Sequence, residues 1–249
     1  MRRRSRLLAA SCGFVAAIAG TGPALAEQKG GVLRIFSSNS PASMSIHEES
    51  TRYAVTPVMA VFNNLVLFDQ HIPQNSFETI RPELAESWSW DEARTALTFT
   101  LRPGVTWHDG HPFTARDVQC TWDLLTGKAE QKLRVSPRKS WYRNLDAVTP
   151  EGDYRVTFHL KRPQPSMLAL LAASASPVYP CHVPPAQMRT HPIGTGPFKF
   201  VEFKPNESIK LVRNPDYWKK DRPFLDGIEY TIVPSPATQV LPSRPASSI

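Results

Sequence analysis

The sequence predicts a mixed α/β fold in which most neighbouring strands are antiparallel. Apolar residues at every second position indicate strands within residues 84–107 and at 154–160. Apolar residues at helical spacing indicate helices at residues 51–68 and from Thr114 onward. The chain is long enough to bury one sizeable core or two small ones.

Residues 84–118 are expected to hold three short strands, two turns and the start of a helix. Trp88 and Trp90 alternate with polar residues, and the same alternation is found at 97–101 and at 105–107. Arg102-Pro103-Gly104 separates the last two strands as a turn. Thr114 is placed as a helix N-cap, with Asp117 three residues later in the position of a capping box.

The other elements follow in chain order. The first strand is expected at 31–36, a core-facing helix at 51–68 and a short helix at 165–173. Further strands are expected at 209–212 and 227–233. We expect the first strand and the 190–233 segment to share one sheet, with a mostly antiparallel part inserted between them.

Residues 1–26 have the pattern of a cleaved signal peptide. Arg2 and its basic neighbours precede an apolar stretch at 7–18, and Ala24-Leu25-Ala26 matches a cleavage site. The apolar stretch is short for a membrane span. We therefore expect cleavage after Ala26 and export to the periplasm. The double arginine leaves the twin-arginine route open, but the rest of that motif is poor, which favours the Sec route.

The basic charge of the chain depends in part on this segment. Removing residues 1–26 takes away four arginines and no acid, so the formal charge falls from +7 to +3. This weakens any nucleic-acid interpretation. Cys120 and Cys181 remain, and in an oxidising compartment they could form a disulfide, although two separate buried thiols fit the sequence equally well.

Three motifs resemble those of the family-5 solute-binding proteins of ABC importers. The segment 84–118 is similar to the family succession L-A-x-S-W and L-R-x-G-V-x-(F/W)-H-D-G-x-P-F-T-A-x-D-V. Pro192–Phe198 resembles P-x-G-T-G-P-F/Y, and Arg213–Trp218 resembles R-N-P-x-Y-W. The resemblance extends over residues 30–238.

The resemblance implies the first lobe of a two-lobed, periplasmic-binding-protein-like fold. Residues 27–240 would form this lobe, incomplete, with an inserted subdomain at about 60–185. Relatives are about twice as long, and residues 241–249 are rich in proline and depart from the family pattern, so we expect a disordered tail there. The resemblance thus implies a truncated fragment that lacks the second lobe and does not bind its solute tightly.

The function implied by the resemblance is capture of a peptide, a related small solute or a metal complex for an ABC permease in the inner membrane. Such a protein is expected to be a monomer, to carry no cofactor or metal of its own, to bind no nucleic acid and to catalyse no reaction. The ligand-facing positions implied by the family are Glu48, Glu49, Ser50, Tyr53, Trp141, Val178 and Tyr179.

Two alternatives use other residues. A metal-dependent hydrolase could use His47, His108 and His111, although no third ligand follows the 108–111 turn at a zinc-like spacing, which favours a structural turn. Likewise, residues 47–49 are expected to form a solvated turn. A polyanion-binding protein could use the basic and aromatic run at 128–143.

Overall fold

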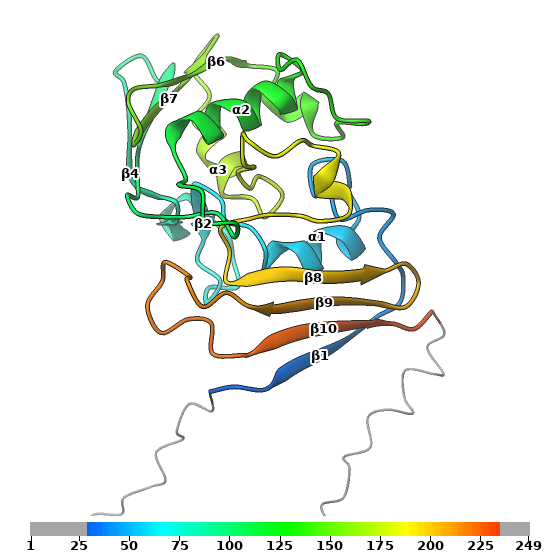
Figure 1. Cartoon of the computed structure of the whole chain (residues 1–249). Helices are drawn as coiled ribbons and strands as arrows, with labels where there is room; N and C mark the ends of the chain where they lie inside the picture. The colour runs from blue at the N-terminus through cyan, green and yellow to red at the C-terminus, as the bar shows by residue number, and fades with distance from the viewer. Residues whose placement is uncertain (1–28, 235–249) are drawn as a thin grey trace, which may run out of the picture.

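The computed structural model describes residues 29–234. Within this range the chain forms two four-stranded sheets and a small two-stranded sheet, together with three α-helices and short 3-10 turns (Figure 1). The predicted mixed α/β fold is therefore confirmed. The predicted signal peptide at 1–26 and the predicted tail at 241–249 lie outside the described residues.

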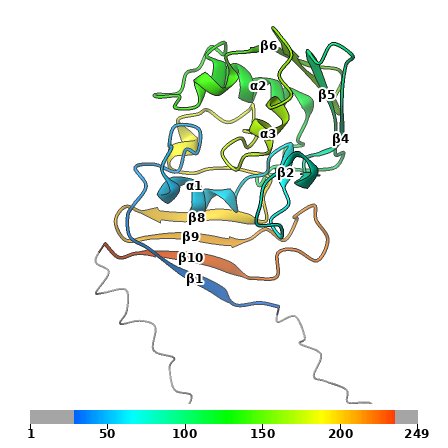
Figure 2. The ribbon, with the colours of Figure 1, turned by 180° about the vertical axis from the view of Figure 1, so that it is seen from behind.

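The first sheet brings together segments from the two ends of the described chain. Its strands are β1 (Val32–Ser37), β8 (Phe198–Lys204), β9 (Ser208–Arg213) and β10 (Gly227–Ile232), in the order β1-β10-β9-β8. β1 pairs with β10 in parallel, and the other pairs are antiparallel. The first strand thus shares a sheet with the 190–233 segment, as its sequence predicts, and lies at the lower edge in Figures 1 and 2.

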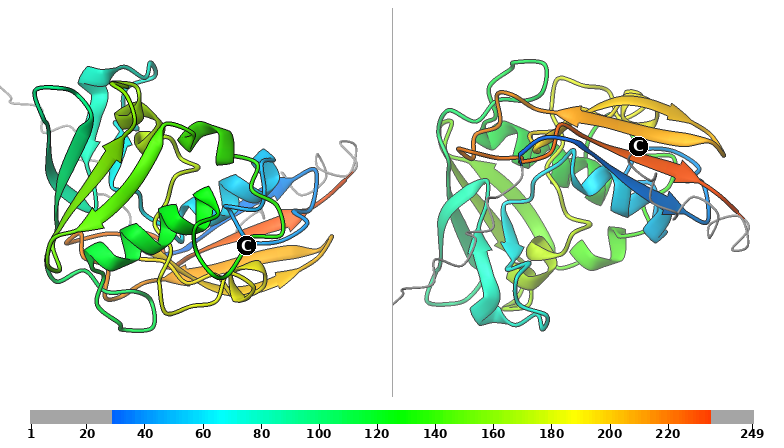
Figure 3. Two further views of the ribbon diagram at one scale, coloured as in Figure 1. Left: turned by 90° about the horizontal axis from the view of Figure 1, so that it is seen from above. Right: turned by 90° about the horizontal axis from the view of Figure 1, so that it is seen from below.

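The second sheet is fully antiparallel. It contains β4 (Ala85–Trp90), β5 (Ala96–Leu101), β6 (Leu145–Pro150) and β7 (Arg155–Leu160), in the order β4-β5-β7-β6. Helix α2 (Ala115–Thr126) lies against it, as the view from above in Figure 3 shows. Trp122 of α2 packs edge-on against Phe158 of β7, with ring centroids 4.9 Å apart, so the helix covers an apolar face of the sheet.

The remaining elements connect or cover the two sheets. Helix α1 lies directly above the first sheet in Figure 1. These elements are α1 (Arg52–Met59), β2 (Val66–Phe68), η1 (Phe77–Thr79), β3 (Ile80–Pro82), η2 (Lys139–Tyr142), α3 (Met167–Ala172) and η3 (Gln187–Arg189).

Two apolar clusters form the interior. One surrounds the second sheet and α2, and includes Trp107, Trp122 and Phe158. The other lies between α1 and the first sheet, and includes Val58 and Tyr230. Each sheet therefore has its own buried face, which is the arrangement expected for a layered α/β protein.

Two of the three family-like motifs meet at one buried side chain, Asn63. Its Oδ1 accepts a hydrogen bond from Thr195 Oγ1 at 3.0 Å, and Trp218 Nε1 lies 3.4 Å from the same oxygen. Its Nδ2 donates to Glu83 at 2.7 Å. A Cβ on Gly194 would lie 1.8 Å from the carbonyl oxygen of Val61, so this close approach requires glycine.

Two predicted elements differ from those observed. The helix predicted at 51–68 ends at Met59, and Val66–Phe68 forms strand β2 instead. The carbonyl groups of Ala60 and Val61 accept hydrogen bonds from Phe198 and Gly196, so a distant segment takes the acceptors that a longer helix would need. The strand predicted at 105–107 is reduced to a single bridge between Thr106 and Pro112.

A search of residues 29–234 finds no helix with the length and apolar character needed to cross a bilayer.

Candidate functional site

The loop between β1 and α1 contains four of the predicted ligand-facing residues, and its central part is buried. Glu48 is 4 % exposed. Its carboxylate accepts hydrogen bonds from Arg189 Nε and Nη2, each at 2.8 Å, and from Arg134 Nε at 3.1 Å. Burial alone would raise the pKa of Glu48, but the hydrogen bonds from the two arginines hold it below its ordinary value.

The solvated turn predicted at 47–49 is therefore wrong. The carboxylate of Glu48 joins the loop to two segments that lie 86 and 141 residues further along the chain. Because both of its oxygens already face arginines, Glu48 is engaged in holding the loop in place.

His47 is buried in the same loop. Its Nε2 lies 2.9 Å from the carbonyl oxygen of Pro177, so this nitrogen carries the proton and donates it. Burial and the nearby cation of Arg138 lower the pKa of His47 to about 3, which keeps the ring neutral. The ring also packs against Tyr179, with centroids 4.3 Å apart.

Val178 and Tyr179, which the family resemblance places at the ligand, lie in the interior. Tyr179 is 3 % exposed and packs against Phe62. Its hydroxyl lies 3.4 Å from Ser45 Oγ, and burial raises its pKa. In this arrangement the side chains of Val178 and Tyr179 contact protein.

Tyr53, by contrast, lines an open hollow of about 320 Å³ at the start of α1. Phe36 and Ser38 of the first strand and its following loop line the same hollow. Ser38 Oγ donates to the Tyr53 hydroxyl at 3.2 Å, which lowers the pKa of the phenol. We call the hollow lined by Phe36, Ser37, Ser38, Arg52, Tyr53 and Thr56 the Tyr53 surface.

Glu49 and Ser50 lie in the loop that leads to the Tyr53 surface. Glu49 Oε1 accepts a hydrogen bond from Ser43 at 3.1 Å, and Ser50 is exposed. The neighbouring backbone is held by Arg138, whose guanidinium donates to the carbonyl oxygens of Ile46 and Glu49 at 2.7 Å. The loop is thus fixed from inside while its end faces outward.

Trp141 lies elsewhere, on η2. It is half exposed and lines a second hollow, whose other lining residues include Arg143, Lys161 and Arg162. None of these residues lines the Tyr53 surface. The structure therefore does not bring the seven predicted positions into one site.

The histidines of the hydrolase alternative are also not brought together. His47 faces Pro177, whereas His108 Nε2 faces the carbonyl oxygen of Gly196 at 3.0 Å. Burial lowers the pKa of His108 to about 4. Among residues 29–234, the single cluster with metal-ligating geometry contains neither of these histidines and consists of Asp109, His111 and His182.

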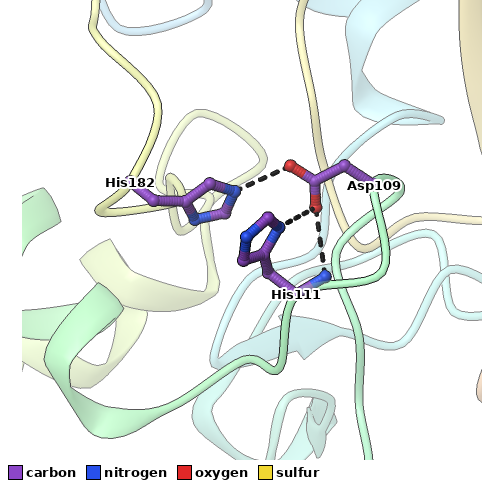
Figure 4. Close-up of side chains that lie close together, drawn as sticks. All are labelled: Asp109, His111 and His182. Carbon is purple, nitrogen blue, oxygen red and sulfur yellow. Dashed lines mark hydrogen bonds and ion pairs between the residues drawn. The ribbon is translucent and has the colours of Figure 1, made fainter.

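His182 is the partner that sequence reasoning missed for the 108–111 turn. Its Nε2 lies 2.7 Å from Asp109 Oδ2, although 73 residues separate the two (Figure 4). A search for local zinc-like spacing could not find a partner at this distance in sequence. The turn therefore has a third candidate ligand, although none follows it at a zinc-like spacing in the sequence.

The basic run at 128–143 is largely engaged within the molecule. Arg134 pairs with Glu48, and Arg138 is 6 % exposed. Lys128 and Lys132 donate to the backbone carbonyls of Asp146 and Gly127. These contacts give four of the cations partners within the molecule, and one of them, Arg134, has its charge paired with a carboxylate.

Comparison with known proteins identifies the family. Residues 79–243 match the model described as "Bacterial extracellular solute-binding proteins, family 5 Middle". The chain is 34 % identical over 165 residues to the oligopeptide-binding protein AppA of Bacillus subtilis, covering 62 % of this chain and 29 % of AppA. It is 31 % identical over 199 residues to a putative ABC transporter peptide-binding protein of Brucella ovis, covering 76 % of this chain and 35 % of that protein.

Solved structures show the same relationship. The structure of B. subtilis AppA in complex with a nonapeptide has a TM-score of 0.73 at 29 % identity, covering 85 % of this chain and 42 % of AppA. The Helicobacter pylori protein DppA, in complex with the peptide STSA, has a similar fold, with a TM-score of 0.75 at 23 % identity, covering 86 % of this chain and 45 % of DppA. The chain thus spans less than half the length of these relatives.

The family match covers more than half of the 249 residues and includes the motifs that meet at Asn63. The chain belongs to the bacterial extracellular solute-binding proteins of family 5.

Proposed function

We propose that this protein captures peptides or peptide-like solutes for an ABC importer and catalyses no reaction itself. The observation that carries the proposal is the similarity to B. subtilis AppA, found both in sequence and in a structure with a bound nonapeptide. The relatives compared above are named as binding proteins. A permease in the inner membrane would be the partner, and the protein would act as a monomer.

We place the solute at the Tyr53 surface. Exposed Phe36 and half-buried Tyr53 offer aromatic area, and the Tyr53 hydroxyl and Arg52 offer hydrogen-bond donors around the same hollow. Such a mixture of apolar faces and a few polar groups is typical of ligand sites. Glu49 and Ser50 precede Arg52 and Tyr53 closely in the sequence, and we include them in the proposed site. Glu48, Val178 and Tyr179 would support it from the interior.

The assay must detect peptide binding over a wide range of dissociation constants, from about 1 μM to about 1 mM, or about −8.2 to −4.1 kcal/mol.

Nuclear magnetic resonance of the 15N-labelled chain, titrated with di- to nonapeptides, meets this need. We expect backbone signals at residues 36–38 and 52–57 to shift in fast exchange. Tyr53→Ala should abolish the shifts, whereas Tyr154→Ala, which removes an exposed tyrosine distant from the hollow, should leave them unchanged. Absence of shifts at 36–38 and 52–57 with every peptide would refute the proposed surface.

We further propose that the exported protein begins at Glu27 in the periplasm. Support comes from the basic and apolar pattern of residues 1–26 and from the family's extracellular character. Amino-terminal sequencing of periplasmic material is the test, and an intact Met1 or a lipid on Cys12 would contradict the proposal.

A further inference from the structure

The structure assigns a binding site for one divalent transition-metal ion to Asp109, His111 and His182. The three side chains converge from two segments far apart in sequence, as Figure 4 shows. This site is separate from the Tyr53 surface and does not depend on the proposed transport of peptides.

The donor atoms are close enough to share an ion. Asp109 Oδ2 lies 2.7 Å from His182 Nε2, and Asp109 Oδ1 lies 3.2 Å from His111 Nδ1. One ligand atom from each residue lies within 4.8 Å of the others. Zinc bonds of about 2.0–2.1 Å in tetrahedral geometry place ligand atoms about 3.3 Å apart, so rotation of the side chains must bring atoms that lie up to 4.8 Å apart closer together.

The donor types select the class of ion. Two imidazole nitrogens and one carboxylate oxygen suit zinc, nickel and copper, whereas calcium and magnesium prefer oxygen ligands alone. The carboxylate supplies one negative charge and two neutral imidazoles supply lone pairs. All three residues are exposed, so an ion can enter and water can complete its coordination.

The backbone holds the first two ligands in place before any ion binds. The amide of Gly110 donates to the Trp107 carbonyl at 2.8 Å, and the amide of Trp107 donates to the His111 carbonyl at the same distance. The His111 amide in turn donates to Asp109 Oδ1 at 3.3 Å. This closed turn presents the carboxylate and the imidazole on one side.

The third ligand is held by its neighbour in sequence. Cys181 forms a disulfide with Cys120 of α2, and its amide donates to Asp117 Oδ1 at 2.8 Å. His182 therefore follows a residue that is anchored twice. The rings of His182 and His111 stack with centroids 4.1 Å apart, and one nitrogen of each lies against the Asp109 carboxylate. A site held on both sides in this way loses little freedom when it binds.

The test is zinc retention by the tag-free full chain after equilibrium dialysis against zinc, followed by elemental analysis. We expect one equivalent of zinc for the wild-type chain. His111→Ala and His182→Ala should each lower the affinity at least about 10-fold, because loss even of an outer-shell partner typically costs that much. His71→Ala removes an exposed histidine from another loop and should leave the affinity unchanged.

A spectrum of the wild-type chain tests the ligands directly, so the test does not depend on whether the variants fold. With Cu²⁺, the electron paramagnetic resonance spectrum should show couplings from two imidazole nitrogens, and one set should disappear in each histidine variant. The assignment is overturned if the wild-type chain retains no zinc after dialysis, or if both histidine variants retain zinc as well as the wild type does.

Discussion

Trp107 and His108 are adjacent in sequence but have different surroundings. Trp107 is 2 % exposed, and its indole packs edge-on against Phe113 and lies 3.4 Å from Asp117 Oδ2. His108 is only partly buried and bonds to the backbone of Gly194 and Gly196. We therefore expect Trp107→Ala to lower the free energy of unfolding by about 3–5 kcal/mol, and His108→Ala by about 1–2 kcal/mol.

Urea denaturation of the two variants provides the measurement, with Trp90→Ala, on strand β4, as a control. Trp90 is only partly buried, so its removal should cost less than that of Trp107. Equal losses for Trp107→Ala and His108→Ala would contradict the packing described for Trp107.

His47 makes the stability of the protein depend on pH. Its pKa in the folded state is about 3, below the ordinary value of 6.5, because burial and Arg138 disfavour the charged ring. As the pH falls, His47 therefore binds a proton near pH 6.5 in the unfolded chain but only near pH 3 in the folded chain. The stabilisation is complete above pH 6.5 and declines as the pH falls toward 3.

We expect His47 to account for a loss of about 2 kcal/mol in unfolding free energy between pH 7.5 and pH 5. His108, whose pKa is lowered to about 4, contributes in the same direction, so the contribution of His47 must be isolated by substitution. His47→Gln should flatten the pH dependence measured by urea denaturation, whereas His71→Gln should not. Parallel pH profiles for His47→Gln and the wild type would contradict the assignment.

The sequence predicted the role of Trp107 better than that of Glu48 or His182. Trp107 belongs to an alternating apolar pattern, which is local and visible in sequence. Glu48 and His182 take their roles from partners more than 70 residues away. Without the fold, nothing in the residues around them distinguishes a buried carboxylate or a converging imidazole from a solvated one.

Asp117 connects helix α2 to two other segments. Its Oδ2 accepts a hydrogen bond from the Thr114 amide at 2.8 Å, which confirms the predicted capping-box position, and its Oδ1 accepts one from the Cys181 amide. Asp117→Ala would leave both amides without these acceptors. We expect a loss of about 2–4 kcal/mol, more than the ~1 kcal/mol of an ordinary cap.

Asp123→Ala is the matched control in the same helix, because the pKa of Asp123 is raised by burial and its charge is not favoured there. Thermal or urea unfolding should show a change within about 0.5 kcal/mol for this variant. If Asp117→Ala lowers the free energy of unfolding no more than Asp123→Ala does, the hydrogen bonds of Asp117 to the Thr114 and Cys181 amides have little effect on stability.

Helix α2 and strands β4, β5 and β7 of the second sheet were predictable because local signals and tertiary structure agree there. Helix α1 was not, because its apolar periodicity continues past the observed end at Met59. The helix ends there as the carbonyls of Ala60 and Val61 pair with the 196–198 segment. The local apolar pattern cannot show that a segment so distant in sequence competes for these carbonyl groups.

At the scale of the whole molecule, the disulfide between Cys120 and Cys181 links α2 to the segment before β8. The Cα atoms lie 5.6 Å apart and the sequence separation is 61 residues. The sequence left the pairing open, and the structure shows the two cysteines bonded. A disulfide that closes a loop of this length restricts the unfolded chain, and this raises the free energy of unfolding by about 4 kcal/mol.

The Cys120→Ser/Cys181→Ser variant should therefore unfold at a lower urea concentration than the oxidised wild type. Adding a reductant to the wild type should reproduce the shift, and adding it to the double variant should have no effect. If the oxidised wild type and the double variant have equal midpoints, the crosslink does not stabilise the fold.

The parallel pairing of β1 with β10 sets the timing of folding during synthesis. Gly31 bonds to Asp226 across 195 residues, so the first strand waits for its neighbour until nearly all of the described chain has left the ribosome. At about 5–20 residues per second this delay is roughly 10–40 s. Ribosome-bound chains stopped before residue 220 should be cut by protease near β1, and chains released after 234 should resist. Such a delay would keep β1 unpaired while a translocation apparatus could still thread the amino end of the chain.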